Sequence, residues 1–115
     1  MHTIQKIDDH HYDITLTRGD SFSMQFALKR GGQDYTPTEG DSIRFAVKRS
    51  YSDPDTAVKI NKTIPTDTLT LELLPADTKT LSMGFGYVYD IQLTDAAGNV
   101  DTFVKGRFKI DTEVL

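Results

Sequence analysis

The fold is decided by the stretch Gly86-Tyr87-Val88-Tyr89-Asp90-Ile91-Gln92-Leu93-Thr94 and by the segment 100–110 that follows it. Apolar and polar side chains alternate in the first stretch, with the apolar side chains at odd positions. The second segment carries its apolar side chains at even positions, namely Val100, Val104, Phe108 and Ile110. A period of two is typical of strands with one buried and one solvated face. The Gly98-Asn99 turn between them predicts an antiparallel hairpin.

The parity of the two apolar sets constrains this hairpin. Facing residues on one side of the sheet must have numbers that sum to an odd value, so the loop should hold an even number of residues, most simply four. A three-residue loop with a bulge would instead place Tyr89 opposite Lys105, unless a second bulge corrects the register.

The same alternation recurs along almost the whole chain. It marks further strands in residues 12–17, 21–29, 42–48, 58–61 and 68–73. Turn signals separate them, among them Arg30-Gly31-Gly32, Glu39-Gly40-Asp41 and Ser52-Asp53-Pro54-Asp55. About seven to eight strands joined by short turns predict an all-β antiparallel sandwich, with a closed barrel as the competing arrangement. One short helical turn is expected near residues 75–81, where Pro75 stands at its start.

Length and composition limit the possible protein classes. The 115 residues suffice for one domain over 1–115, with 1–11 as an N-terminal arm and 111–115 as a C-terminal tail. The formal net charge of −4 gives no general attraction to nucleic acid or anionic membranes. The chain has no Cys, which excludes disulfides and thiolate chemistry. The first residues show no signal peptide, and no apolar run is long enough for membrane insertion.

Several short motifs have simpler interpretations than a functional site. Arg18-Gly19-Asp20 spells an integrin-binding tripeptide, but its place between two strand patterns favours a turn. His2, His10 and His11 lie near three aspartates, yet neighbouring residues of a strand point to opposite faces, so no metal site is predicted. The two carboxylates of residues 52–55 are too few for a calcium loop.

The sequence does not predict an enzyme. It contains no nucleophile elbow, phosphate loop or His-Glu-x-x-His pattern, and three His near one end make a catalytic triad difficult to build. No cofactor is implied. Lys105, Arg107 and Lys109 form a basic stripe, which cross-strand charge pairing with residues such as Asp90 explains better than nucleic-acid binding.

A few apolar residues are candidates for subunit contacts. Phe103 and Val88 fall on the faces that should be solvated, and the chain ends add further ones, so the candidate interface residues are Ile4, Ile7, Val88, Phe103 and Leu115.

The order of signals resembles a known family. It runs from Arg18-Gly19-Asp20-Ser21-Phe22 through Gly40-Asp41-Ser42-Ile43-Arg44-Phe45, Leu73-Leu74-Pro75-Ala76-Asp77 and Gly86-Tyr87-Val88-Tyr89-Asp90-Ile91 to Gly106-Arg107-Phe108-Lys109-Ile110. This is similar to the immunoglobulin-like β-sandwich domains of tailed-phage virion proteins, most of all to the N-terminal domain of the phage baseplate upper protein family. The resemblance covers roughly residues 12–110.

The resemblance implies a fold detail and a function. In immunoglobulin-like domains a Tyr near the start of a late strand bonds to the preceding loop, a role that falls to Tyr87, with Tyr89 next. We expect a structural component of a phage or prophage tail, baseplate or connector, made in the host cytoplasm and assembled into the virion. Its partners would be other tail proteins or copies of itself in a ring. The alternative is a carbohydrate- or receptor-binding module, for which Tyr35 and Tyr51 are the best platforms.

Overall fold

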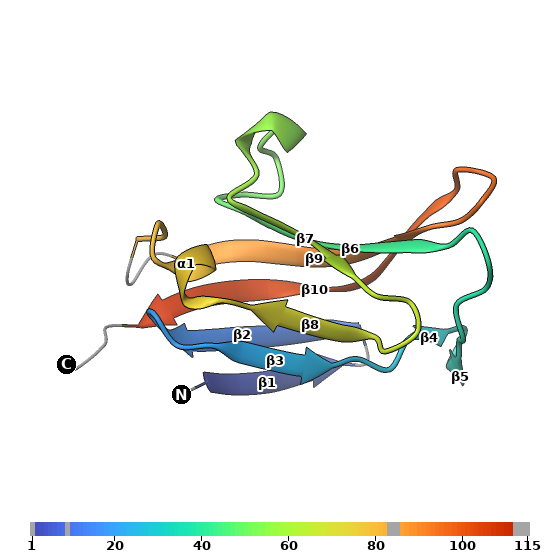
Figure 1. Cartoon of the computed structure of the whole chain (residues 1–115), viewed down its shortest axis with the longest axis horizontal. Helices are drawn as coiled ribbons and strands as arrows, with labels where there is room; N and C mark the ends of the chain where they lie inside the picture. The colour runs from blue at the N-terminus through green and yellow to red at the C-terminus, as the bar shows by residue number, and fades with distance from the viewer. Residues whose placement is uncertain (1, 9, 83–85, 112–115) are drawn as a thin grey trace.

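The computed structural model describes residues 2–8, 10–82 and 86–111 and shows an all-β sandwich, as predicted (Figure 1). The larger layer is a six-stranded sheet with the spatial order β1 (His2–Asp8), β2 (His11–Thr17), β10 (Val100–Asp111), β9 (Gly86–Thr94), β6 (Ser42–Lys48) and β7 (Ile60–Ile64). The smaller layer pairs β3 (Phe22–Gln25) with β8 (Thr70–Leu73). A short hairpin joins β4 (Lys29–Arg30) to β5 (Gln33–Asp34).

The helical content of the described chain is small. A 3₁₀ turn, η1 (Asp55–Ala57), lies in the connection from β6 to β7. The helix α1 (Pro75–Thr78) confirms the expected helical turn, although it is shorter than the predicted range 75–81. The carboxylate of Asp77 accepts the backbone N–H of Leu74 at 2.7 Å, which satisfies one of the free donors at the start of the helix.

The predicted alternation places the core correctly in most strands. The inward side chains of both layers form one apolar cluster, and the rings of Phe45, Tyr89 and Phe108 meet at centroid distances of 5.5 to 6.4 Å. Some strand ends differ from the prediction. Leu69 adopts a left-handed conformation with φ of 52°, so β8 begins only at Thr70, and Phe26 and Leu28 are buried beyond the end of β3.

The hairpin between β9 and β10 takes the less simple of the two predicted forms. Its loop holds three residues and is closed by the bond from the Asp95 N–H to the Asn99 carbonyl, 2.9 Å, with Gly98 at φ of 89°. The expectation of a four-residue loop is therefore wrong. A second bulge at Phe103 corrects the register, because Thr102 faces Gln92 while Val104 faces Ile91. Tyr89 consequently lies opposite Gly106.

This bulge overturns two further predictions. Residues before the bulge alternate in the opposite phase, so Val100 is 56% exposed, whereas the sequence pattern predicts it on the core face. Phe103, predicted on the solvated face, is only 4% exposed and packs against Tyr35. A one-residue shift of a strand moves every following side chain to the other face, which explains both errors.

Two tyrosines fix neighbouring parts of the fold through their hydroxyl groups. The Tyr87 hydroxyl accepts the Ser82 backbone N–H at 2.8 Å, which confirms the expected bond to the preceding loop. The Tyr89 hydroxyl donates to the Tyr12 carbonyl oxygen at 2.6 Å and thereby reaches from β9 across β10 to β2. The pKa of Tyr89 is raised because the ring is buried.

The second strand and the last are direct neighbours in the large sheet. β2 and β10 pair in parallel, with Lys105 opposite His11 and Phe108 opposite Ile14, so the sandwich is not purely antiparallel. Between these pairs, Gly106 lies against the backbone of Tyr12. A Cβ atom at Gly106 would stand 2.8 Å from the Tyr12 carbonyl carbon and closer still to its oxygen. Only glycine permits this approach.

We therefore expect Gly106→Ala to destabilise the fold by about 3 kcal/mol, because the new methyl group collides with backbone that cannot move aside. Urea unfolding followed by circular dichroism measures the loss. The matched control is Gly86→Ala on β9, where a Cβ atom meets only the tip of Arg107 at 3.9 Å. Similar stability of the two variants would contradict the proposed constraint.

Candidate functional site

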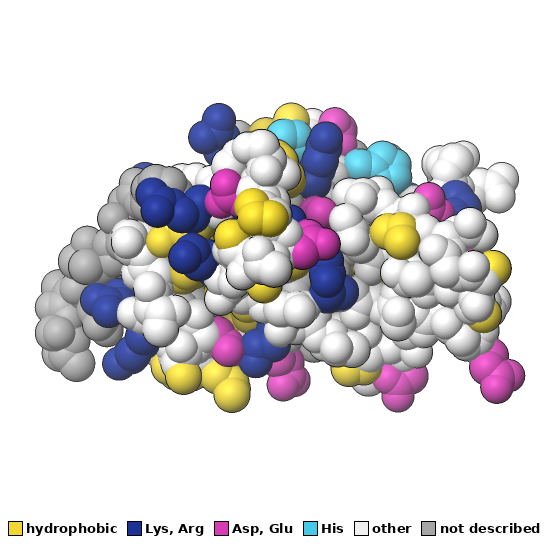
Figure 2. Space-filling model, turned by 90° about the horizontal axis from the view of Figure 1, so that it is seen from above, with side chains coloured by type: hydrophobic (Ala, Val, Ile, Leu, Met, Phe, Trp, Pro, Cys, Tyr) yellow, Lys and Arg dark blue, Asp and Glu magenta, His cyan; other side chains and the backbone are white. Residues whose placement is uncertain are grey.

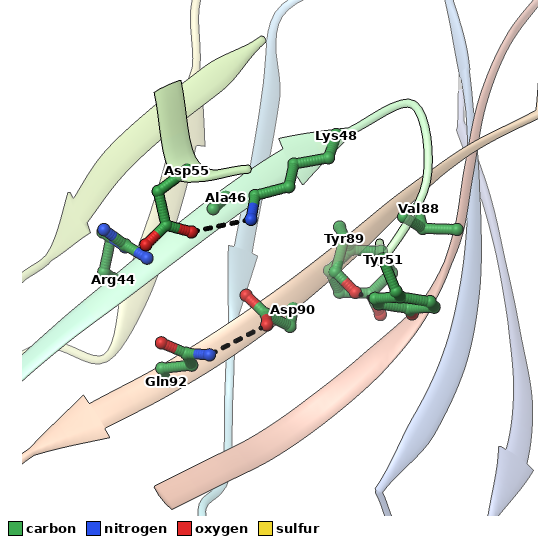
Figure 3. A pocket seen from close by; sticks show the side chains of 9 residues that line it. All are labelled: Arg44, Ala46, Lys48, Tyr51, Asp55, Val88, Tyr89, Asp90 and Gln92. Carbon is green, nitrogen blue, oxygen red and sulfur yellow. Dashed lines mark hydrogen bonds and ion pairs between the residues drawn. The ribbon is translucent and has the colours of Figure 1, made fainter. Parts of the chain in front are cut away.

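A cavity lies on the solvent-facing side of the large sheet, between the outward side chains of β6 and β9 and the β6–β7 connection (Figure 3). Its volume is about 160 Å³. β6 contributes Arg44, Ala46 and Lys48, β9 contributes Val88, Asp90 and Gln92, and the connection adds Tyr51 and Asp55. We call this the outer cavity. Its polar groups stand on strands whose opposite face is fixed in the core, so their positions are well defined.

One ion pair holds the β6–β7 connection against β6. The Lys48 ammonium lies 2.7 Å from the Asp55 carboxylate and also donates to the Asp53 carbonyl oxygen at 3.2 Å. The hydrogen bond and charge of Lys48 hold the pKa of Asp55 below its ordinary value. The turn predicted at residues 52–55 thus serves as one wall of the outer cavity.

Asp90 and Arg44 are less completely paired. The Gln92 amide donates to the Asp90 carboxylate at 3.0 Å. Partial burial raises the pKa of Asp90, and the positive charge of Arg44 opposes this shift. Within residues 2–8, 10–82 and 86–111, no hydrogen bond or ion pair joins the Arg44 guanidinium to another side chain. The outer cavity therefore holds unused hydrogen-bonding capacity of both kinds.

Tyr51 is fixed in place although 52% of the residue is exposed. Its hydroxyl accepts the Gly106 N–H at 3.1 Å, and the carbonyl oxygens of Tyr89 and Gly106 both lie at 3.1 Å to receive its proton. Partial burial raises the pKa of this hydroxyl. The ring is thus held at the wall of the outer cavity, with the Lys105 ammonium 6.0 Å from its centroid and about half of the residue exposed.

Tyr35, the other predicted platform, is engaged elsewhere. The Arg30 guanidinium lies 4.6 Å from its ring centroid, Phe103 packs against it at 5.7 Å, and its hydroxyl donates to Asp41 at 2.8 Å. Arg30 also forms an ion pair with Asp101. These contacts cover the bulge at Phe103. They also leave Tyr35 less exposed than Tyr51.

The candidate interface residues do not form one surface. Ile4 is half-buried against the core, Ile7 is exposed at the end of β1, and Val88 is half-buried in the outer cavity. The predicted exposure of Phe103 is wrong, and Leu115 lies outside the described residues. The structure therefore separates these residues onto the β1 edge, the outer cavity and the core.

The other sequence motifs have structural explanations. Arg18-Gly19-Asp20 forms a turn after β2, with Gly19 at φ of 84° and the Arg18 side chain donating to the Lys79 carbonyl oxygen at 2.7 Å. His11 contacts Asp13 at 3.1 Å, and His10 contacts the Phe103 carbonyl oxygen at 2.9 Å. No group of three or more potential metal ligands occurs among the described residues.

The charged surface is mixed. Seen from the side on which η1 projects, basic and acidic side chains are interspersed, with hydrophobic side chains scattered between them (Figure 2). In the described part of the chain, no helix has the length and apolar character needed to cross a membrane. Comparison with known proteins finds no family model and no curated protein that matches this chain.

The environment of Asp90 gives a stability prediction. Its pKa is higher in the folded than in the unfolded chain, so the charged form costs stability at neutral pH and protonation removes that cost. We expect Asp90→Asn to raise the melting temperature at pH 7, with a gain that vanishes below the ordinary pKa of an aspartate. Scanning calorimetry across pH measures this. Asp67→Asn, at an exposed position, is the control, and an unchanged or lower melting temperature for Asp90→Asn at pH 7 would refute the expectation.

Proposed function

We propose that this protein is a non-enzymatic structural component of a phage or prophage tail, baseplate or connector, and that it acts through protein–protein assembly. The order of its sequence signals and its sandwich fold support this role. The observation that carries the assembly mechanism is the edge position of β1, which among the described strands pairs only with β2. Such an edge presents backbone donors and acceptors that another strand can pair with.

The two edges of the large sheet differ. At the β7 edge, Lys62 points inward between the buried Ile60 and Ile64 and pairs with Asp77 at 2.9 Å. A charge directed inward on a short edge strand disfavours pairing with another sheet. β1 is longer, at seven residues against five, and its pairing with β2 is irregular only between Lys6 and Asp8. β1 also carries a lysine, Lys6, on the face of Ile4, but this residue is exposed and does not lie between buried side chains. β1 is therefore the better edge for adding a strand.

The geometry of β1 favours a second copy of the same strand. When two copies of β1 pair antiparallel, the joined sheet has both core faces on the same side only under one condition. Each residue of one copy must lie opposite a residue from the same face of the other copy. All seven residues pair only when the contact is centred on Gln5. That register sets Lys6 opposite Ile4 and separates the two Lys6 ammonium groups, whereas centring on Lys6 would bring them together.

This contact uses the same patch on both copies and therefore closes as a two-fold dimer, not as a ring. A ring built from sheet edges would need β1 of one copy to meet β7 of the next, which Lys62 disfavours. A ring-shaped tail assembly would then use these dimers, or single copies, as units that contact other tail proteins.

Light scattering coupled to size-exclusion chromatography, over a concentration series, tests the self-contact. We expect dimers in the wild type and about fivefold weaker dimerisation in Gln5→Lys, because two like charges then face each other at a cost of about 1 kcal/mol. Gln33→Lys, which adds the same charge at an exposed position of β5, is the matched control. A wild type that stays monomeric at every concentration would rule out self-assembly through β1.

Disulfide trapping gives an independent test of the register. Because the chain has no native Cys, Gln5→Cys introduces a single thiol that faces its own copy in the centred register. Oxidation should produce a covalent dimer of Gln5→Cys but not of Gln33→Cys. Efficient trapping of Ile4→Cys or Lys6→Cys in its place would show that the strands pair in another register.

A further inference from the structure

The outer cavity combines several polar groups with no net charge. The formal charges of Arg44 and Lys48 cancel those of Asp55 and Asp90. Lys48 and Asp55 already satisfy each other at 2.7 Å. What remains available is the Arg44 guanidinium as a donor and the Asp90 carboxylate as an acceptor, with the Gln92 amide beside it. A ligand of strong single charge gains little here, whereas a neutral ligand with donors and acceptors can use all three groups.

We propose that the outer cavity binds a neutral, hydroxyl-rich ligand of one ring, that is, a monosaccharide unit, between the polar side chains of Arg44, Asp90 and Gln92 and the apolar wall formed by Tyr51 and Val88. Planar carboxylate, amide and guanidinium groups match the hydroxyls of a sugar. An aromatic ring offers its face to the C–H groups of a sugar.

The geometry of the wall supports this assignment. Tyr51 is half exposed, yet its hydroxyl is fixed by the backbone of Tyr89 and Gly106 at 3.1 Å, so the ring needs no ordering when a ligand arrives. Ala46, at 4% exposure, gives a small side chain at the base of the outer cavity, which leaves room above the sheet. Figure 3 shows Asp90 and Gln92 side by side on β9, with Val88 farther along the same strand. Tyr51, from the β6–β7 connection, lies near Val88.

The size of the outer cavity limits the ligand. Its volume of about 160 Å³ is well below the roughly 300–1,000 Å³ of pockets that hold drug-sized molecules. One ring fits, and the rest of a longer glycan would extend into solvent. We therefore expect weak binding of single sugars, with a dissociation constant on the order of 1 mM.

Asp90 is consistent with a binding role. Asp90 is a partly buried carboxylate with a raised pKa, and such groups cluster at functional sites. The outer cavity lies over β6 and β9, whereas the proposed assembly contact lies at β1, at one edge of the sheet. The two proposals are independent, and either can fail without the other.

Titration of the ¹⁵N-labelled full chain by NMR tests the proposal. The probes are methyl glucoside, methyl galactoside, N-acetylglucosamine and rhamnose, with sodium acetate and methylammonium chloride as charged probes. At least one sugar should produce saturable shifts confined to the amides of residues 44–48, 51–55 and 88–92. No saturable shift with any sugar, or binding of only a charged probe, would overturn the proposal and leave the charged groups as a support for the β6–β7 connection.

Paired variants assign the contacts. Asp90→Asn and Arg44→Gln should each weaken binding of the responding sugar by about tenfold, because each removes a charged hydrogen-bond partner. Asp67→Asn and Arg30→Gln make the same chemical changes at exposed positions outside the outer cavity and should leave binding unchanged. Equal affinity for all four variants would show that the sugar binds elsewhere. Amide spectra of each variant verify that the fold is retained.

Discussion

The close contact between Gly106 and the backbone of Tyr12 determines how the two halves of the large sheet join. Because Gly106 has no side chain, β10 approaches β2 closely enough for the Tyr89 hydroxyl to cross it and reach the Tyr12 carbonyl oxygen at 2.6 Å. The Tyr51 hydroxyl contacts the same glycine through its backbone N–H. One position thus connects β2, β9, β10 and the β6–β7 connection, and any larger side chain would separate them.

The sequence predicts the sandwich because period-two alternation is visible in each long strand except β1, whose residues follow no such period; the expected N-terminal arm over 1–11 in fact contains this strand, which pairs with β2. It also defines the possible registers of the last hairpin, but it cannot choose between them. The choice depends on Phe103, which looks solvent-facing by alternation and is buried by the bulge. Its burial is stabilised by Tyr35 and Arg30, which stand some seventy residues earlier in the chain. Local pattern carries no information about such distant contacts.

The candidate site was only partly visible in the sequence. The polar residues Arg44, Lys48 and Asp90 are recognisable as outward-facing positions of two strands, and Tyr51 as an aromatic residue in a connection. Their convergence depends on the path of residues 49–59, which follow no strand period. That path is set by the bonds of the Tyr51 hydroxyl to β9 and β10 and by the pair of Lys48 with Asp55. The sequence pattern therefore does not predict the outer cavity, which becomes recognisable only in the folded structure.

The parallel pairing of β2 with β10 also determines the order in which parts of the sheet can form during synthesis. During synthesis the β1–β2 hairpin leaves the ribosome when its neighbour in the sheet, residues 100–111, has not yet been made. The six-stranded sheet cannot close until residues 100–111 have been made, so its formation is dominated by contacts that are distant in sequence. In that interval both sides of the hairpin are exposed. During that interval β2 has an unpaired edge of its own, which can pair with other strands until β10 covers it.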